Sequence, residues 1–382
     1  MADSVPTTRD AHGMPVWSIL VALLLLAGIW LLPDLAPREN LPIQGEERLH
    51  ARIMEIVGPG SATLQTIARV ELLEGADAGE VIEAIIEAPM TGPDTTSVPM
   101  GYQAGDEVVV SRFGGPAGGF ASISDRWRVP VLGGLLALFA AAVILVGGWR
   151  GLKSLLALAL TLMVVIKLVI PLLLRGWDPV PVAVVAATGL TVATLLLTEG
   201  SRRSAYAAII GTAASLALTA LLAAGFTAFA RFSALQGSDE VAFLIPLLGA
   251  SFDPSGLLLA GTIFGALGVL DDVTMTQAAT VEQLRRSDPA ASSSRVVARA
   301  MEVGRSHIAA TVNTLVLAYL GAGLPLLLLF AVGGPSPLLI VNGEIVAVEV
   351  VRTLVGSIGI VAAVPLTTIV ATYLLPPRPL AA

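Results

Sequence analysis

Two adjacent carboxylic acids, Asp271 and Asp272, stand directly after an apolar run that begins near Leu257. On a helix, Asp272 lies about 22 Å along the axis from Leu257, in the inner third of a hydrocarbon core about 30 Å thick. An ionised Asp at the centre of a bilayer costs about 2.5–3.5 kcal/mol. Two interpretations follow. Either the membrane span ends here and both acids lie among the lipid headgroups, or the acids belong to a buried polar site.

Three glycines, Gly261, Gly265 and Gly268, precede the acids at helical spacing. Residues i, i+4, i+7 and i+11 share one face of a helix, so the glycines and Asp272 form a line, with Asp271 about a third of a turn away. A line of small residues lets a second helix approach closely in a membrane. We therefore expect the glycines to pack against a partner helix and Asp272 to point toward it.

A second polar group stands at the start of a later apolar stretch and consists of His307, Thr311, Asn313 and Thr314. The two stretches are expected to cross the membrane in opposite directions, so His307 and the acids lie at similar depth. Carboxylates with hydroxyl and amide oxygens can bind Na⁺ or pass protons, and a carboxylate–His pair is a common relay. The alternative is that His307 pairs with Asp272 only to hold the helices together and that Asn313 is an interhelical contact.

An ionisable residue, Lys167, also interrupts another apolar stretch. A lysine at that depth must extend its ammonium group to the interface, pair with an acid or face a wet cavity. Asp178, Glu344 and Glu349 are the acids expected near the same end of the membrane. Lys167 is therefore either a snorkelling residue or a further candidate for binding an ion or substrate.

No pattern typical of an enzyme or of a cofactor accompanies these residues. The chain has no phosphate-binding loop, no G-x-S-x-G or H-E-x-x-H motif and no nucleotide-binding domain, and nothing in it suggests nucleic-acid binding. It has no cysteine, and its three histidines, His12, His50 and His307, are too scattered to form a metal cluster. We therefore expect neither catalysis nor a metal or cofactor.

The composition of the 382 residues is that of a helical membrane protein with many spans. Hydrophobic residues make up 55% of the chain, charged residues only 13%, and the mean hydropathy is +0.83, which excludes an ordinary soluble globule. The net charge of −7 indicates no acidic surface, because the charges gather in a few loops. About eight spans are predicted. Their ranges are 14–32, 129–148, 153–175, 179–198, 204–230, 255–275, 306–330 and 353–375.

Prolines at three interior positions of these spans, Pro171, Pro325 and Pro365, predict kinks, because proline removes a backbone donor and crowds the preceding turn.

Residues 41–128 break the membrane pattern and separate the first span from the seven-span domain 129–375. Short β-like runs are divided by Gly, Pro and Asp punctuation, as in EGADAGE and TGPDTTSVPMG. The runs cover residues 49–57, 63–73, 81–88 and 107–113. They predict a small β barrel or sandwich. It holds no acid–base cluster or basic stripe, so we expect a structural module or one that docks a partner.

The positive charges predict the orientation of the chain. Most Arg and Lys of the short loops fall on one side if the N-terminus is cytoplasmic. The tail 1–13, the loop 276–305 and the tail 376–382 are then cytoplasmic, and the β domain lies outside. Only two lysines among abundant Ala, Val, Leu and Gly indicate a high-GC bacterial genome, and hence the plasma membrane of a bacterium.

Four segments carry a resemblance to a known family. They are WRGLKSLLALAL (149–160), GALGVLDDVTMTQAATVEQL (265–284), HIAATVNTLVLAYLGAGLPLLLLF (307–330) and VEVVRTLVGSIGIVAAVPLTT (348–368). From about Asp125 to Leu375 the chain resembles the YibE/F family of bacterial multi-pass membrane proteins. The resemblance implies a membrane protein for which transport has been suggested. The family commonly has Asp after Gly-Arg where this chain has Ser306, so an acid is not indispensable there.

Two functional hypotheses follow for this protein of the lipid bilayer. The first is a secondary transporter or channel with a cation or proton site between spans six and seven. Asp272 would be the principal ligand or proton carrier, Asp271 its tuner, and His307, Thr311 and Asn313 the supporting groups. The second is an envelope component that does not transport and whose β domain docks another envelope protein. The substrate, a small ion or molecule, stays unnamed, and both hypotheses are compatible with a homo-oligomer.

Overall fold

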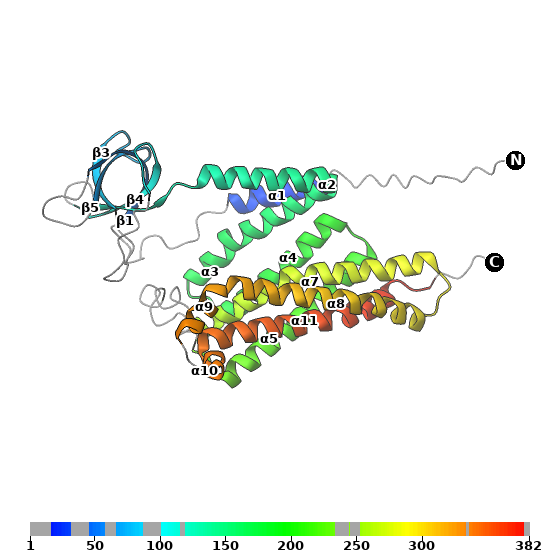
Figure 1. The fold of residues 1–382 in the computed structure, drawn as a ribbon. Coiled ribbons are helices and arrows are strands. Elements are labelled where there is room, and N and C mark those ends of the chain that lie inside the picture. The colour runs from blue at the N-terminus through cyan, green and yellow to red at the C-terminus, as the bar shows by residue number, and fades with distance from the viewer. Residues whose placement is uncertain are drawn as a thin grey trace. The chain divides into compact units, whose positions relative to one another are not determined.

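The computed structural model describes residues 17–31, 46–57, 66–86, 101–114, 119–233, 244, 253–333 and 336–377. The chain divides into two compact units, which are treated separately below (Figure 1). Asn40–Val143 form the β unit, and Met1–Glu39 with Ile144–Ala382 form the helical unit. The predicted tail 1–13 and residues 378–382 of the predicted C-terminal tail lie outside the described residues.

The chain is mainly helical, with a small β domain near its N-terminus. The helical elements are α1 (Trp17–Trp30), α2 (Val129–Val164), the π-helix η2 (Val165–Val169), α3 (Ile170–Leu174), α4 (Pro179–Glu199), α5 (Arg203–Ala230), α7 (Pro254–Ser287), α8 (Ser293–Ala322), α9 (Leu324–Gly333), α10 (Pro337–Asn342) and α11 (Glu344–Leu374). In the described part, five helices are long and apolar enough to cross a membrane, and the bent pair α8–α9 would make a sixth.

A break at Gly148 bears on the predicted number of spans. Val129–Leu174 is a helical stretch of 46 residues, more than twice the number of residues that one span needs. Gly148 interrupts it with φ 55° and ψ −134°, a backbone conformation that favours glycine. The predicted spans 129–148 and 153–175 correspond to the two sides of this break. A total of eight spans is reached only if the two halves of Val129–Leu174, the bent pair α8–α9 and the short helix α1 each count as one span beside α4, α5, α7 and α11. The number eight therefore stays a prediction.

The interior prolines act as their chemistry requires. Pro171 directly follows the π-turn η2, where the Ile170 N–H bonds to the Val165 carbonyl. The wider turn gives room to the proline ring, which would otherwise crowd the carbonyl four residues before it. Pro325 opens α9, which is bent by 60° from α8. Pro365 lies inside α11, which continues through it.

Helices α7 and α8 are longer than the sequence predicts. α7 continues to Ser287 and α8 begins at Ser293, so the predicted loop 276–305 is largely helical and only a short turn joins the two helices. Buried Arg285 holds this turn by donating to the Ala291 carbonyl and to Ser293 Oγ. The predicted span 255–275 lies within α7, and the polar residues that follow it belong to the same 34-residue helix.

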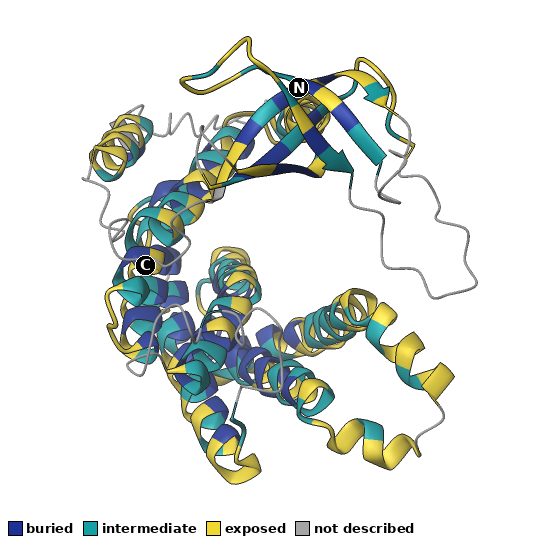
Figure 2. Cartoon of the chain, turned by 90° about the vertical axis from the view of Figure 1, so that its left-hand side faces the viewer, coloured by how far each residue is buried: buried dark blue, intermediate teal, exposed yellow. Residues whose placement is uncertain are grey.

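Helices α5, α7 and α11 form the centre of the helical unit, and α4 and α8 pack around them. Two close approaches join α5 to α11. Gly211 lies against Thr367, and Gly359 lies against Thr219, so that a Cβ at either glycine would overlap the threonine. Figure 2 shows the buried residues on the faces that these helices turn toward one another.

The β unit is a closed barrel with the strand order β1-β2-β3-β5-β4. The strands are β1 (Glu46–Val57), β2 (Thr66–Leu72), β3 (Val81–Ile86), β4 (Glu107–Phe113) and β5 (Phe120–Arg126). Neighbours are antiparallel except β3 and β5, which are parallel, the topology of an OB-type barrel. β5 lies outside the predicted runs because FASISDR carries only a short apolar alternation.

Strand β1 organises the barrel because it pairs with both β2 and β4. A bulge between Ile53 and Glu55 bends the strand between its two partners. Alternate residues point inward, so Ala51 and Ile53 are fully buried while Met54 is exposed. The barrel therefore has an apolar core of its own.

Candidate functional site

Asp271 lies on the face of α7 that packs against α4 and α5. Thr191 Oγ1 of α4 donates a hydrogen bond to Asp271 Oδ1 at 3.1 Å. Thr194 of α4 and Thr212 of α5 also interact with this carboxylate. Three hydroxyl groups from two neighbouring helices therefore surround one acid near the middle of α7.

A further hydroxyl extends this group along α7. Thr274 Oγ1 lies 2.7 Å from Thr212 Oγ1 and 3.2 Å from the Asp271 carbonyl oxygen. Both threonines are fully buried. Each hydroxyl carries a single proton. If Thr212 donates to the carboxylate, Thr274 donates to Thr212. If Thr274 donates to the Asp271 carbonyl, Thr212 donates to Thr274. The chain of hydroxyls thus has two alternative hydrogen-bonded states.

Asp272 and the glycine line lie on another face of α7, which is exposed. A Cβ at Gly261 would meet Arg352 at 3.9 Å, one at Gly265 would meet the Tyr319 hydroxyl at 3.1 Å, and one at Gly268 would meet nothing within 4 Å. Side chains, but no helix backbone of the described chain, reach this line. The close helix contacts that we expected here occur instead at Gly211 and Gly359, because those glycines face the central helix pair.

The structure brings together part of the predicted group on α8. His307 is partly buried and within electrostatic range of Asp272, as the antiparallel course of α7 and α8 predicts. Thr311 is also partly buried, whereas Asn313 and Thr314 are exposed. Thr314 Oγ1 donates to the Ala310 carbonyl of its own helix at 2.9 Å. The two acids therefore have different neighbours, Asp271 the hydroxyls of α4 and α5, and Asp272 the histidine of α8.

Lys167 lies at the centre of the π-turn η2 and is partly buried. Each of the three acids expected near it has a partner that the structure shows. Asp178 caps α4 by accepting from the Val180 N–H at 3.0 Å, Glu349 pairs with Arg352 at 2.6 Å, and Glu344 accepts from Ser233.

Sequence reasoning missed the hydroxyl partners of Asp271 and a buried amide near them. Gln277 Nε2 donates to the Ala300 carbonyl at 2.9 Å and to Thr368 Oγ1 at 2.7 Å, which ties α7 to α8 and α11. A usable signal was present on α5, where hydroxyl residues recur at helical spacing. They are Thr212, Ser215 and Thr219, all fully buried.

The described residues contain no group of three or more His, Cys, Asp or Glu side chains that could hold a metal ion. Around Asp271 the available ligands are one carboxylate and neutral hydroxyl oxygens. Hard monovalent cations and protons suit this set, whereas transition metals prefer imidazole or thiolate ligands.

Comparison with known proteins gives a family but no characterised relative. A family model described as YibE/F-like protein matches residues 135–377. No curated protein and no solved structure matches the chain.

Proposed function

The chain belongs to the YibE/F-like family and carries several apolar helices of membrane-spanning length, and on this basis we propose a secondary transporter or channel that binds a proton or small cation at Asp271. In this proposal the N-terminus is cytoplasmic, in the plasma membrane of a bacterium. From the sequence alone Asp272 is the preferred ion ligand or proton carrier. We now propose Asp271 for this role.

The observation that supports the proposal is the hydroxyl shell of Asp271. A carboxylate in an apolar span is costly unless hydrogen bonds or a bound cation stabilise its charge. Thr191, Thr194 and Thr212 supply such contacts from helices other than α7. A helix needs no acid in order to pack, and purely apolar residues would do so without this cost, so the acid with its shell is best explained by binding.

The two states of the Thr212–Thr274 pair give the site a means to respond to its occupant. An ionised Asp271 accepts a hydrogen bond from the Thr212 hydroxyl. A protonated or cation-bound Asp271 carries less negative charge, so this hydrogen bond is weaker. When this hydrogen bond to Asp271 is lost, the Thr212 hydroxyl can donate to Thr274 instead. The hydrogen bond between α5 and α7 then reverses its direction. Binding at Asp271 is thereby coupled to a helix interface, as a transporter requires.

Flux through proteoliposomes tests the proposal. The purified protein is reconstituted with a pH-sensitive dye inside, and gradients of H⁺, Na⁺ and K⁺ are imposed in turn. We expect Asp271→Asn to abolish the ion-dependent signal while the protein still inserts and purifies. Asp272→Asn is the matched control, because it removes the same charge from the adjacent, exposed position, and we expect it to retain most of the flux.

Equal loss of flux in both variants would contradict the assignment of the carrier to Asp271, and absence of flux in the wild type with every ion would contradict ion transport. The second candidate is then the non-transporting envelope component. The separate apolar core of the β barrel favours a docking role, because such a unit can present a surface without help from the helices. Under that hypothesis, deletion of 41–128 abolishes function and Asp271→Asn only lowers stability.

A further inference from the structure

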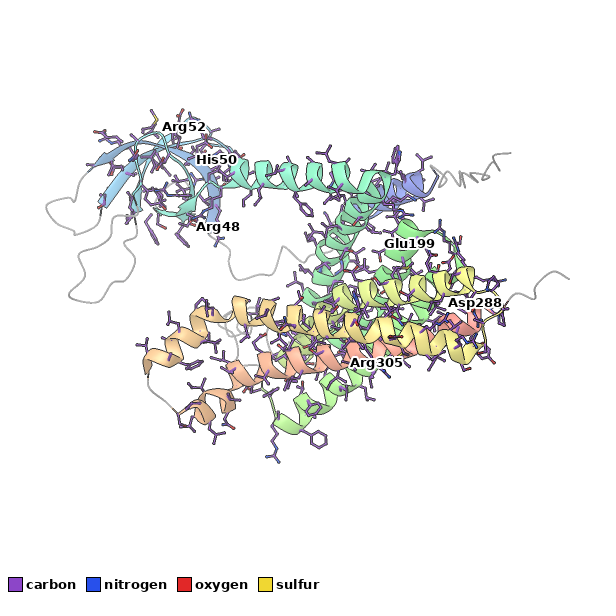
Figure 3. The ribbon with its side chains drawn as sticks, turned by 45° about the vertical axis from the view of Figure 1, so that its right-hand side comes forward. Arg48, His50, Arg52, Glu199, Asp288 and Arg305 are labelled. Atoms are coloured by element: carbon purple, nitrogen blue, oxygen red, sulfur yellow. The ribbon has the colours of Figure 1, made fainter. Side chains whose placement is uncertain are left out.

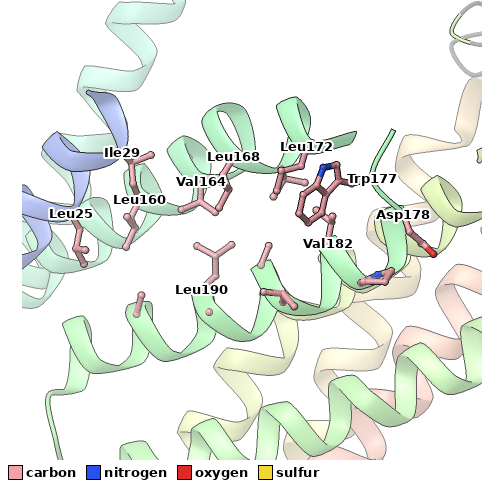
Figure 4. A pocket seen from close by; sticks show the side chains of 16 residues that line it. Leu25, Ile29, Leu160, Val164, Leu168, Leu172, Trp177, Asp178, Val182 and Leu190 are labelled. Carbon is pink, nitrogen blue, oxygen red and sulfur yellow. The ribbon is translucent and has the colours of Figure 1, made fainter. Parts of the chain in front are cut away.

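An apolar cavity of about 650 Å³ lies in the helical unit between α1, the α2–α3 segment and α4. This size falls within the range of about 300–1,000 Å³ typical of small-molecule sites. Of the described residues that line it, only Asp178 is charged, and it lies at one end beside Trp177. Figure 4 shows this polar end opposite the end formed by Leu25 and Leu160.

The cavity exists because α4 presents small side chains along one face. Ala186, Gly189 and Ala193 recur at helical spacing and form its floor. A Cβ built on Gly189 meets no atom within 4 Å, so the space above this glycine is open. Helix α1 closes the far side through Leu25 and Ile29.

The length of the cavity suits one hydrocarbon chain. Its lining on α4 extends from Pro181 to Ala193, about 18 Å along the helix axis. One leaflet of a bilayer is about 15 Å deep, half of a core of about 30 Å. A shape of this length with an apolar wall fits an acyl chain that enters from the end at Trp177.

The polar end carries groups that suit an anionic headgroup. Trp177 is 59% exposed, and tryptophan side chains gather at the level of lipid headgroups. Arg175, the C-cap of α3, is also exposed and stands two residues before this tryptophan. Asp178 accepts from one backbone N–H of the first turn of α4, that of Val180, and the helix N-terminus partly offsets its negative charge.

From these features we infer that the cavity binds one acyl chain of an anionic phospholipid, with the phosphate near Arg175. The lipid would fill the space between α1 and α4 and add to the contact that Ala22 of α1 already makes with Ala157 and Leu197. Because the site lies on the face of α4 opposite the Asp271 contact, this inference does not depend on the proposed transport activity.

Native mass spectrometry of the full chain tests the inference. The protein is purified in mild detergent, stripped of lipid and titrated with phosphatidylglycerol or with phosphatidylcholine. We expect one tightly held phosphatidylglycerol per chain and at least tenfold weaker retention of phosphatidylcholine, whose headgroup has no net charge. Gly189→Trp fills the cavity and should abolish the adduct. Gly225→Trp is the control, since Gly225 also has open space around it but lies on α5, away from the cavity.

Arg175→Gln separates the two parts of the site. We expect this variant to bind phosphatidylglycerol no better than phosphatidylcholine. Retention of the adduct by Gly189→Trp, or its equal loss in Gly225→Trp, would overturn the inference. Equal binding of both lipids by the wild type would overturn the assignment of the phosphate to Arg175.

Discussion

At the scale of single residues, Asp271 and Asp272 are neighbours on α7, but Asp271 contacts hydroxyl groups of α4 and α5 whereas Asp272 is exposed. The helical periodicity places Asp271 and Asp272 on different faces, and the proximity of Asp272 to His307 follows from the antiparallel course of two spans. The hydroxyl partners of Asp271 lie far away in the chain, at Thr191, 80 residues before it, and at Thr212. Which acid is enclosed depends on those long-range contacts, and the local pattern carries no information about them.

The charge of Glu107 in the β unit should make the barrel sensitive to acid. A hydrogen bond from Arg52, with a second from His50 (both labelled in Figure 3), lowers the pKa of Glu107 below its ordinary value of 4.5. A lowered pKa contributes stability that is complete above the ordinary value and is lost as the pH falls through the lowered one. We therefore expect the pairing of β1 with β4 to weaken below about pH 4.5.

Hydrogen exchange of β1 and β4 peptides in the full chain, corrected for the intrinsic rate at each pH, measures this effect. Glu107→Gln should reduce the dependence on acid in that window. An unchanged dependence in the variant would show that other carboxylates are responsible.

Core packing of the barrel gives a second prediction for single residues. Ile53 is fully buried, and its replacement by alanine should lower the free energy of unfolding by about 2–5 kcal/mol. The neighbouring Met54, 52% exposed, is the control, and its replacement should cost no more than about 0.5 kcal/mol. Denaturant unfolding followed by exchange of the barrel peptides separates the two. Similar losses would mean that the side chains of β1 do not alternate as described.

At the scale of elements, the close approach of α5 and α11 can be tested by a pair of substitutions. Gly359→Ala places a methyl group on Thr219 Oγ1 and should cost about 1–3 kcal/mol as overpacking. Thr219→Ala removes the overlapping hydroxyl, and the remaining Cβ lies at 3.4 Å, an ordinary contact. The double variant should therefore be more stable than Gly359→Ala alone.

Thermal unfolding in detergent measures these differences, with Gly225→Ala as the control that meets open space. A double variant that is less stable than either single variant would contradict the packing described here.

The sequence predicts the long helices well because apolar periodicity is local, but it does not show which glycine faces which helix. At Gly261 and Gly265 the nearest groups are the side chains of Arg352 and Tyr319, whereas Gly211 and Gly359 lie against threonines of the facing helix.

At the scale of the whole molecule, the division into two units predicts that the barrel folds by itself. Its buried residues come from its own strands, and β1 pairs with β4, which are the two ends of the strand order. A fragment of residues 41–128 should unfold cooperatively, with the far-ultraviolet circular dichroism of a β protein. A fragment that stays unfolded in water would show that the helical unit contributes to its stability.

The sequence predicts a mainly helical protein with apolar spans and a small β domain, because composition and hydropathy can be read at every position of the chain without knowledge of long-range contacts. Closure of the barrel, however, also requires the parallel pairing of β3 with β5, at Ile85–Ser122 and Ile86–Ile123. Pairing between segments so far apart depends on the geometry of all five strands, and therefore the sequence left barrel and sandwich open.

The π-turn at Val165–Val169 has a consequence for the history of the chain. A π-turn contains one residue more than an α-turn, so a helix that gains a residue by insertion can absorb it there while both flanks keep their faces. Pro171 is accommodated directly behind this turn. Relatives that lack the proline are therefore expected to lack one residue within 165–169. In an alignment of family sequences, the two differences should occur together.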